Sequence, residues 1–302
     1  MINQHIIPHL WFDKEALEAI EFYKSVFPNV TILNTTTIHD TPSGDADITT
    51  FTLADYRFMA LNGGPFFTMN PSISFFVTID PAYDPQAEEH LDQLWEKLLP
   101  GAKILMPLDQ YPFSKRYGWI QDRFGVSWQL ILSDPLGEQR PMIVPSLMFV
   151  HEVCGKAEEA RDFYLSVFNN SRAGVIARYP EAMEPNREGT AMYLDFMIEN
   201  QWFAAMDSAF PHEFSFQESI SLIISCDTQQ EIDYYWEQLS AVPEAEQCGW
   251  LKDRYGVSWQ VSPRILDEMM ASGTQQQVDR VVKALLPMKK LDIQELVKAF
   301  TT

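Results

Sequence analysis

The chain has 302 residues, of which 46% are hydrophobic and 13% aromatic, values that are typical of globular proteins. This length is enough for two domains with cores of ordinary size. A formal net charge of −20 argues against a phosphate-backbone partner, so no nucleic acid is expected to bind. The three cysteines are an odd number without CxxC spacing, and we expect reduced thiols.

Hydrophobic alternation and turn residues predict a recurring order of elements. Residues 14–27 place Leu17, Ile20 and Tyr23 at helical spacing, directly after an apolar, β-rich segment. The first half is expected to contain a strand at 6–12, a helix at 14–27, strands at 30–38, 47–53 and 57–61, a strand at 72–79, a helix at 86–98, and strands near 103, 118 and 126. This order is βαβββ, twice.

The second half repeats the order. Its expected elements are, in turn, 144–150, 156–168, 174–178, 191–198, 202–207, 219–226, 229–239, 249–252 and 257–262. Beyond them, the stretches 278–285 and 293–300 each carry an apolar stripe at helical spacing. We expect these tail helices to dock on the preceding domains or to bridge them.

Two matched motifs show that the chain contains a duplication. Residues 117–129 read YGWIQDRFGVSWQ and residues 248–260 read CGWLKDRYGVSWQ, with nine identities in thirteen positions. Residues 21–27, EFYKSVF, similarly match residues 162–168, DFYLSVF. The predicted domains are therefore 1–134, 143–265 and a helical extension at 266–302.

The start MINQHIIPHLWF has no cationic leader, and no apolar run approaches the ~18 residues of a membrane span. We expect a cytoplasmic protein without a membrane partner. It should be a monomer whose two copies mimic a dimer of single-copy relatives, or a homodimer.

Paired βαβββ modules with PHLWF…AIEFYKSVFPN near the start and DRFGVSWQL at the end resemble the PhnB-like branch of the vicinal oxygen chelate superfamily, which includes glyoxalases and bleomycin-resistance proteins. The resemblance implies a tandem α+β fold, in which each lobe is a cupped mixed sheet made of two modules. Its members have carried the label of 3-demethylubiquinone-9 3-methyltransferase. This chain has no glycine-rich strand-to-helix turn of the kind that a Rossmann-type cofactor site needs.

The resemblance also implies where a divalent metal would bind, on the first and last strands of each module. The closing-strand position falls on Gln129 and Gln260, neutral amides that are weaker ligands than a carboxylate. The opening-strand position falls on Ile7 and Val144, which cannot ligate. Other side chains at these strand ends are His9, Ser146, Asn62 and Asp207. We expect no metal and no cofactor.

Aromatic side chains supply further candidates for the cups. Trp11, Trp119 and Trp250 are expected either in the core or on the walls of a cup. Strand alternation places Gln129 opposite Trp128 and Gln260 opposite Trp259, so the amides should face the cups and these tryptophans the helices. 

The repeated Asp-Arg-aromatic-Gly sequence predicts a tight turn whose Asp accepts from backbone N–H groups. Cys248 replaces Tyr117 at the rim of a cup and has no base nearby in sequence that would activate its thiol. We interpret it as a wall residue.

Three functions stay open. The first is metal-free binding of a small, largely apolar molecule by His9, Trp11, Trp119, Gln129, Ser146, Asp207, Cys248, Trp250 and Gln260. The second is a divalent-metal-dependent lyase, isomerase or dioxygenase. The third is a structural or interaction protein whose cups are filled by side chains. Whether the protein is an enzyme is left open.

Overall fold

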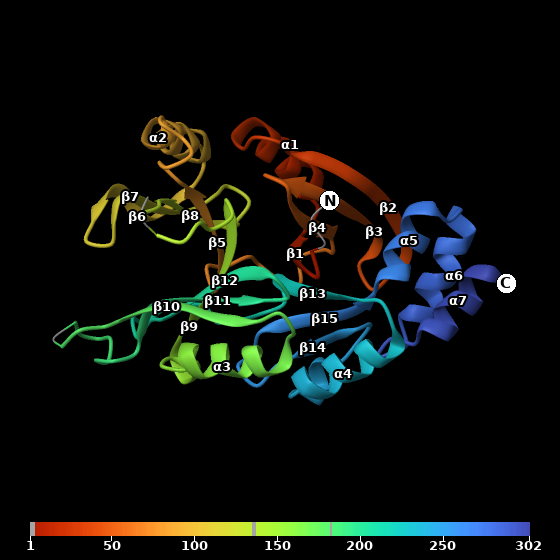
Figure 1. The fold of residues 1–302 in the computed structure, drawn as a ribbon. Helices are drawn as coiled ribbons and strands as arrows, with labels where there is room; N and C mark the ends of the chain where they lie inside the picture. Colours follow the sequence, from red (N-terminus) through yellow and green to blue (C-terminus); the bar gives the residue numbers. More distant parts are fainter. Residues whose placement is uncertain (1–3, 135–136, 182) are drawn as a thin grey trace. The chain divides into compact units, whose positions relative to one another are not determined.

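The computed structural model describes residues 4–134, 137–181 and 183–302 (Figure 1). Four modules follow one another along the chain. Module 1 contains β1 (Ile6–Phe12), α1 (Ala16–Val26), β2 (Thr31–Thr41), β3 (Gly44–Leu53) and β4 (Tyr56–Asn62). Module 2 contains β5 (Ile73–Ile79), α2 (Ala87–Leu98), β6 (Lys103–Tyr111), β7 (Ser114–Gln121) and β8 (Ser127–Leu132).

The second copy supplies the other two modules. Module 3 contains β9 (Ile143–Phe149), the 3-10 turn η1 (His151–Val153), α3 (Ala157–Val167), β10 (Arg172–Arg178), β11 (Ala191–Ile198) and β12 (Gln201–Asp207). Module 4 contains β13 (Ile220–Cys226), α4 (Gln229–Leu239), η2 (Pro243–Ala245), β14 (Trp250–Lys252) and β15 (Ser258–Pro263). The tail forms α5 (Arg264–Ser272), α6 (Gln275–Leu285) and α7 (Ile293–Thr301).

The predicted order βαβββ is confirmed in modules 1 to 3, and module 4 departs from it. A 3-10 turn at Pro243–Ala245 stands where module 2 has the strand β6. The second copy is shorter here, and Pro243 lacks the N–H that a strand ladder requires.

The described strands form two mixed sheets, of seven and eight strands (Figure 1). Their orders are β14-β15-β13-β1-β4-β3-β2 and β10-β11-β12-β9-β5-β8-β7-β6. The first sheet thus joins module 1 to module 4, and the second joins module 2 to module 3. Each sheet is mixed and is made of two modules, as expected, but the two modules of a sheet come from different copies. The apolar pattern of an opening strand specifies its buried faces but not which partner strand it pairs with.

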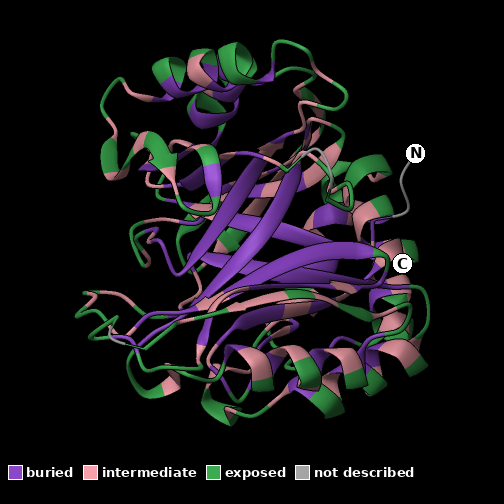
Figure 2. Ribbon diagram, turned by 60° about the vertical axis from the view of Figure 1, so that its left-hand side comes forward, coloured by how far each residue is buried: buried purple, intermediate pink, exposed green. Residues whose placement is uncertain are grey.

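Two compact units correspond to the two sheets. Unit 1 comprises residues 1–20, 30–68 and 216–302, and unit 2 comprises residues 21–29 and 69–215. In unit 1, β1 lies at the centre, antiparallel to β13 and parallel to β4. In unit 2, β5 pairs antiparallel with β9. The opening strands β1, β5, β9 and β13 are almost wholly buried, as the purple strands of Figure 2 show.

The predicted Asp-Arg-aromatic-Gly turn is confirmed in both copies. The Asp122 carboxylate accepts from the backbone N–H of Phe124 (2.8 Å) and Val126 (3.0 Å) and from the Trp128 indole (2.9 Å). Asp253 makes the matching bonds with Tyr255, Val257 and Trp259. The glycines that close the two turns have φ of +89° and +88°, the left-handed region that favours glycine.

These turns also fix which side chains of the closing strands β8 and β15 are buried. Trp128 and Trp259 are each 1% exposed. The Trp128 ring lies 5.5 Å from Tyr23 and 4.9 Å from Phe27, within unit 2. Trp128 therefore packs against the end of α1, as predicted for the face opposite Gln129.

The tail docks on unit 1. Leu266, Met269, Val281, Leu291 and Leu296 form one buried cluster among the tail helices. The Thr36 hydroxyl on β2 donates to the carbonyl of Met270 on α5 (3.0 Å). The tail is thereby anchored to the edge strand of the first sheet, which confirms the expected docking.

Within the described residues, no helix has both the length and the apolar character needed to cross a membrane.

Replacing Val281 by Asp should destabilise unit 1 by about 3 kcal/mol or more, because it buries an unpaired carboxylate in the tail cluster. Val281 is 0% exposed, whereas Lys283 on the same helix is exposed. Chemical denaturation followed by tryptophan fluorescence measures the effect, with Lys283→Asp as the matched control. Equal effects of the two substitutions would show that the tail is an independent appendage.

Candidate functional site

A cavity of about 640 Å³ lies in unit 1. One wall is the concave face of the seven-stranded sheet, and the other is formed by α5, α6 and the segment 285–291. The loop at 63–67 contributes Phe66 and Phe67 at its edge. The residues that line the cavity come from modules 1 and 4 and from the tail. Residues from both ends of the sequence therefore meet in this cavity.

Strand alternation decides which side chains reach the cavity. On β4, Arg57, Met59 and Leu61 line it, while Phe58 and Ala60 are 0% exposed on the opposite face. On β1, His9 and Trp11 line it for the same reason. A single register therefore places apolar and polar groups side by side on the cavity wall.

Aromatic rings form one corner of the cavity. The Trp11 and Trp250 rings lie 6.2 Å apart at 72°, and the ring of His9 meets Trp250 edge-on at 5.5 Å. Phe67 packs edge-on against Trp11 at 5.1 Å. The Trp11 indole donates to the carbonyl of Gly64 (2.8 Å), which fixes the ring. These rings offer a rigid apolar surface to a bound molecule.

Gly63 is required beneath Trp11. An added Cβ at Gly63 would lie 2.3 Å from the Trp11 ring, so any side chain would displace the indole. The ring thus lies directly on the backbone of the loop that borders the cavity.

His9 is 3% exposed, and its Nδ1 has no hydrogen-bond partner in the described part of the chain. Burial lowers its pKa to about 3, so the imidazole is neutral at physiological pH. A neutral ring can donate from one nitrogen and accept at the other. It supplies a hydrogen bond but no charge.

Gln260 and Cys248 complete the part of the site that sequence predicts. The Gln260 amide donates to the Ser221 hydroxyl (2.9 Å), and the residue lines the cavity. The Cys248 thiol lies 3.2 Å from the carbonyl of Leu286. Burial raises the pKa of this thiol, which disfavours the reactive thiolate. Cys248 is therefore a wall of the cavity and lacks the activation of a nucleophile.

Sequence reasoning missed two charged residues of the cavity, Arg57 and Asp267. Arg57 alternates with the apolar Met59 and Leu61, and this pattern already indicates that it faces the cup. Asp267 lies on α5, a helix that has no counterpart among the described residues between β8 and β9. Burial raises the pKa of Asp267 to about 6, partly offset by the positive charges of Arg57 and Arg264.

The corresponding face of unit 2 is filled by side chains. Phe76, Tyr117, Trp119, Val144, Met148, Val150, Trp202 and Ala204 form one buried cluster. Gln129 is 1% exposed, accepts from the Tyr117 hydroxyl (2.6 Å) and donates to the Ser74 hydroxyl (2.8 Å). All of its hydrogen-bonding groups face the protein interior, so the amide offers little to a ligand.

Three further predicted residues lie outside the cavity of unit 1. The Trp119 indole donates to the Ser127 hydroxyl (2.7 Å), and Ser146 is 1% exposed on β9. The Asp207 carboxylate accepts from the backbone N–H of Gly155 (2.7 Å) and Ala157 (3.1 Å) at the start of α3. Asp207 thus has the environment of a helix cap.

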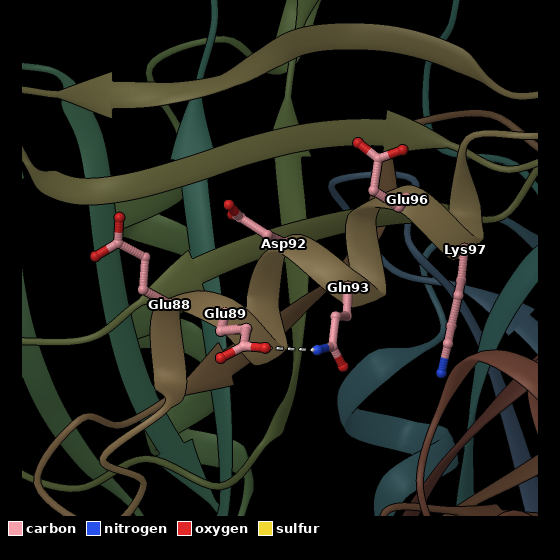
Figure 3. Close-up of a pocket in the computed structure, with 6 residues that line it drawn as sticks. All are labelled: Glu88, Glu89, Asp92, Gln93, Glu96 and Lys97. Carbon is pink, nitrogen blue, oxygen red and sulfur yellow. Dashed lines mark hydrogen bonds between the residues drawn. The ribbon is translucent and has the colours of Figure 1, made fainter.

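An acidic hollow on α2 is a separate surface feature (Figure 3). It is lined by Glu88, Glu89, Asp92, Gln93, Glu96 and Lys97, all from this one helix. The Gln93 amide donates to Glu89 (3.2 Å), and Asp92 pairs with Arg116 (2.7 Å). The hollow is the solvated face of a helix and has no second wall.

Comparison with protein families decides the relationship. Residues 4–131 and 141–262 each match the model of the 3-demethylubiquinone-9 3-methyltransferase family. The chain belongs to this family. The two matched segments also confirm the tandem duplication.

Solved structures show a similar fold in glyoxalase I. Glyoxalase I from Zea mays has 12% sequence identity and a TM-score of 0.54, over 89% of this chain and 98% of that chain. A PhnB protein from Bacillus cereus, described as a candidate 3-demethylubiquinone-9 3-methyltransferase, is 37% identical over 43% of this chain and 100% of that chain, with a TM-score of 0.38. A fosfomycin resistance protein from Listeria monocytogenes is 14% identical over 44% and 95%, with a TM-score of 0.33. No curated protein matches the chain.

The resemblance noted in the sequence implies a divalent metal, and the side chains of the described residues do not fit one. Among the described residues, no three His, Cys, Asp or Glu side chains are grouped so that they could hold an ion. The apolar Ile7 and Val144 occupy the opening-strand positions, and each is buried. On the strands the cavity is lined by His9 and Gln260, and Asp267 on α5 does not complete a metal-binding group with them in the described part of the chain.

Replacing Asp267 by Asn should raise the melting temperature at pH 7.5 by roughly 2–4 °C. The folded pKa of about 6 lies above the ordinary value of 3.8 for an aspartate, so this carboxyl favours folding less as pH rises between those values. The gain should therefore shrink towards zero as the pH falls to about 4.

The control is Asp279→Asn on the tail helix α6. A hydrogen bond from Gln275 lowers the pKa of Asp279, so this substitution should bring no gain at pH 7.5. A gain for Asp267→Asn that is independent of pH would contradict the assigned environment.

Proposed function

We propose that the cavity of unit 1 binds a small, largely apolar molecule without a metal ion. The observation that carries the proposal is the contrast between the two cups. Unit 1 holds about 640 Å³ of space lined by Trp11, Trp250, Met59 and a few polar groups. Ligand sites in proteins are typically about 300–1,000 Å³, mostly apolar, with a small number of placed polar groups.

The methyltransferase activity in the family's description finds no support in the site. A dinucleotide-like cofactor needs a glycine-rich turn between a strand and the following helix. The connection from β1 to α1 is Asp13-Lys14-Glu15, without glycine, and the connection from β9 to α3 has Gly155 alone. The proposal therefore rests on the cavity and not on that description.

A metal-dependent lyase, isomerase or dioxygenase is the second candidate. It requires at least three good ligands around open coordination positions. The cavity offers a neutral His9, the amide of Gln260 and Asp267 on α5. Asp267 is the single acid in that set, so the donor chemistry favours binding of an uncharged or dipolar molecule.

A structural role fits unit 2 better than unit 1. Its cup is occupied by Tyr117, Trp119, Trp202 and their neighbours, which form a hydrophobic core. We propose that unit 2 supports the fold, while unit 1 holds the ligand.

A neutral fluorophore tests the proposal directly. N-phenyl-1-naphthylamine should bind the chain with a rise in its emission, and Thr50→Trp should abolish this binding by filling the cavity, since Thr50 on β3 lines it. Thr52→Trp is the matched control, because Thr52 lies on the same strand outside the lining and should keep binding. No binding by the wild type, or equal binding by the Thr50→Trp variant, would refute the proposal.

Metal content tests the second candidate. Protein purified without chelator should contain less than about one equivalent of divalent metal, and a chelator should leave its melting temperature unchanged, because the site lacks ligands. Stoichiometric zinc, nickel, manganese or iron that disappears in His9→Ala but persists in His90→Ala would establish the metal-dependent alternative instead.

A further inference from the structure

Two opposite charges line the same cavity without a direct hydrogen bond or ion pair to the protein. Arg57 stands on β4 between the sheet and the tail, and Asp267 stands on α5 opposite. In the described part of the chain, neither the guanidinium nor the carboxylate makes a hydrogen bond or an ion pair, with each other or with another residue. Both side chains are half-buried, and the positive charges of Arg57 and Arg264 act on Asp267 only from beyond ion-pair distance. Each charged group therefore keeps its hydrogen-bonding capacity for a ligand in the cavity.

The position of Arg57 is fixed by its backbone. The Gln4 side chain brackets it, accepting from the Arg57 N–H (2.7 Å) and donating to the Arg57 carbonyl (2.9 Å). The same strand register sends Arg57, Met59 and Leu61 to the cavity. The backbone of Arg57 is therefore fixed at the end of an apolar row, and its side chain extends from the cavity wall.

Asp267 is held with comparable rigidity. Asp267, Met270 and Ala271 form one stripe of α5 that lines the cavity, at the i, i+3 and i+4 spacing of a helix face. The Thr36 hydroxyl anchors this helix at Met270, and Arg264 at its start pairs with Asp227 (2.6 Å). The carboxylate thus keeps its place across from the sheet.

The counterpart positions in unit 2 carry no such charges. Trp202 occupies the position of Arg57 in the equivalent strand and is 6% exposed, with the Arg140 guanidinium 3.6 Å above its ring. The described residues between β8 and β9, 133–134 and 137–142, also form no helix like α5. The charged pair is therefore specific to the open cup.

We propose that the cavity recognises an amphipathic molecule with a zwitterionic head group, whose anionic group pairs with Arg57, whose cationic group pairs with Asp267, and whose apolar body lies against Trp11 and Trp250. This inference rests on the proposed binding function and adds the class of ligand.

Electrostatics selects that head group over the alternatives. Water can solvate both charges in the empty cavity, and a bound molecule must replace that water. A monoanion pairs with Arg57 but meets the charge of Asp267, and a monocation meets Arg57 in the same way. An uncharged molecule leaves both charges unpaired and desolvated. A zwitterion satisfies both groups at once and keeps the site neutral.

Four probes with one apolar body separate these cases. L-4-phenylphenylalanine is zwitterionic, its carboxamide is cationic, its N-acetyl derivative is anionic, and the N-acetyl carboxamide is neutral. Each competes with bound N-phenyl-1-naphthylamine, and the loss of emission gives its affinity. The zwitterion should displace the fluorophore at a concentration lower by about tenfold than either singly charged probe.

Variants that remove one charge should change the order of the four probes' affinities for the cavity. Asp267→Asn should make the anionic probe the better competitor, and Arg57→Gln should do the same for the cationic probe. Retained fluorophore binding shows that both variants are folded. The controls Asp279→Asn and Lys97→Gln remove charges outside the cavity and should leave the order unchanged.

The outcomes separate the two proposals. If the fluorophore binds but the zwitterion competes no better than the other probes, or if the variants do not change the order, the head-group inference is wrong and the binding function stands. If none of the four probes displaces the fluorophore, the head-group inference is likewise wrong and the binding function stands. If the wild type binds no fluorophore, the binding function itself fails.

Discussion

The antiparallel pairing of opening strands is the constraint on which the rest of this structure depends. β1 pairs with β13, and β5 pairs with β9, so each sheet joins modules that are not from the same copy. In unit 1, this pairing sets His9 opposite Ser221, whose hydroxyl holds the Gln260 amide. Without it, Trp11 and Trp250 could not share a cavity, since 239 residues of sequence separate them.

Equivalent scaffolds give different cups because a few positions differ in volume and charge. Tyr117 in unit 2 fills space and saturates Gln129, whereas its counterpart Cys248 leaves room beside Gln260. Arg57 replaces the aromatic Trp202 at another equivalent position. Protein interiors are close-packed, so removing one aromatic ring from a cup changes whether a ligand can enter. The two cups share a scaffold and thus differ in how far side chains fill them.

Local sequence predicted the elements and the turns, because both depend on nearby residues. The closing strands were predictable from the alternation around Trp128 and Trp259. The turns were predictable from the glycines that follow Asp122 and Asp253. Partner choice between strands was not predictable, since all four opening strands are similarly apolar. Arg57 was identifiable from alternation on β4. Asp267 was not, because its role depends on where a tail helix docks.

The most direct test of the central claim is a crystal structure with N-phenyl-1-naphthylamine bound. The account predicts probe density in unit 1, in contact with Trp11 from module 1, Trp250 from module 4 and Met270 from the tail. It predicts no probe beside Tyr117 and Gln129, where side chains occupy the cup. Density in the cup of unit 2, or a sheet in which module 1 pairs with module 2, would contradict the account.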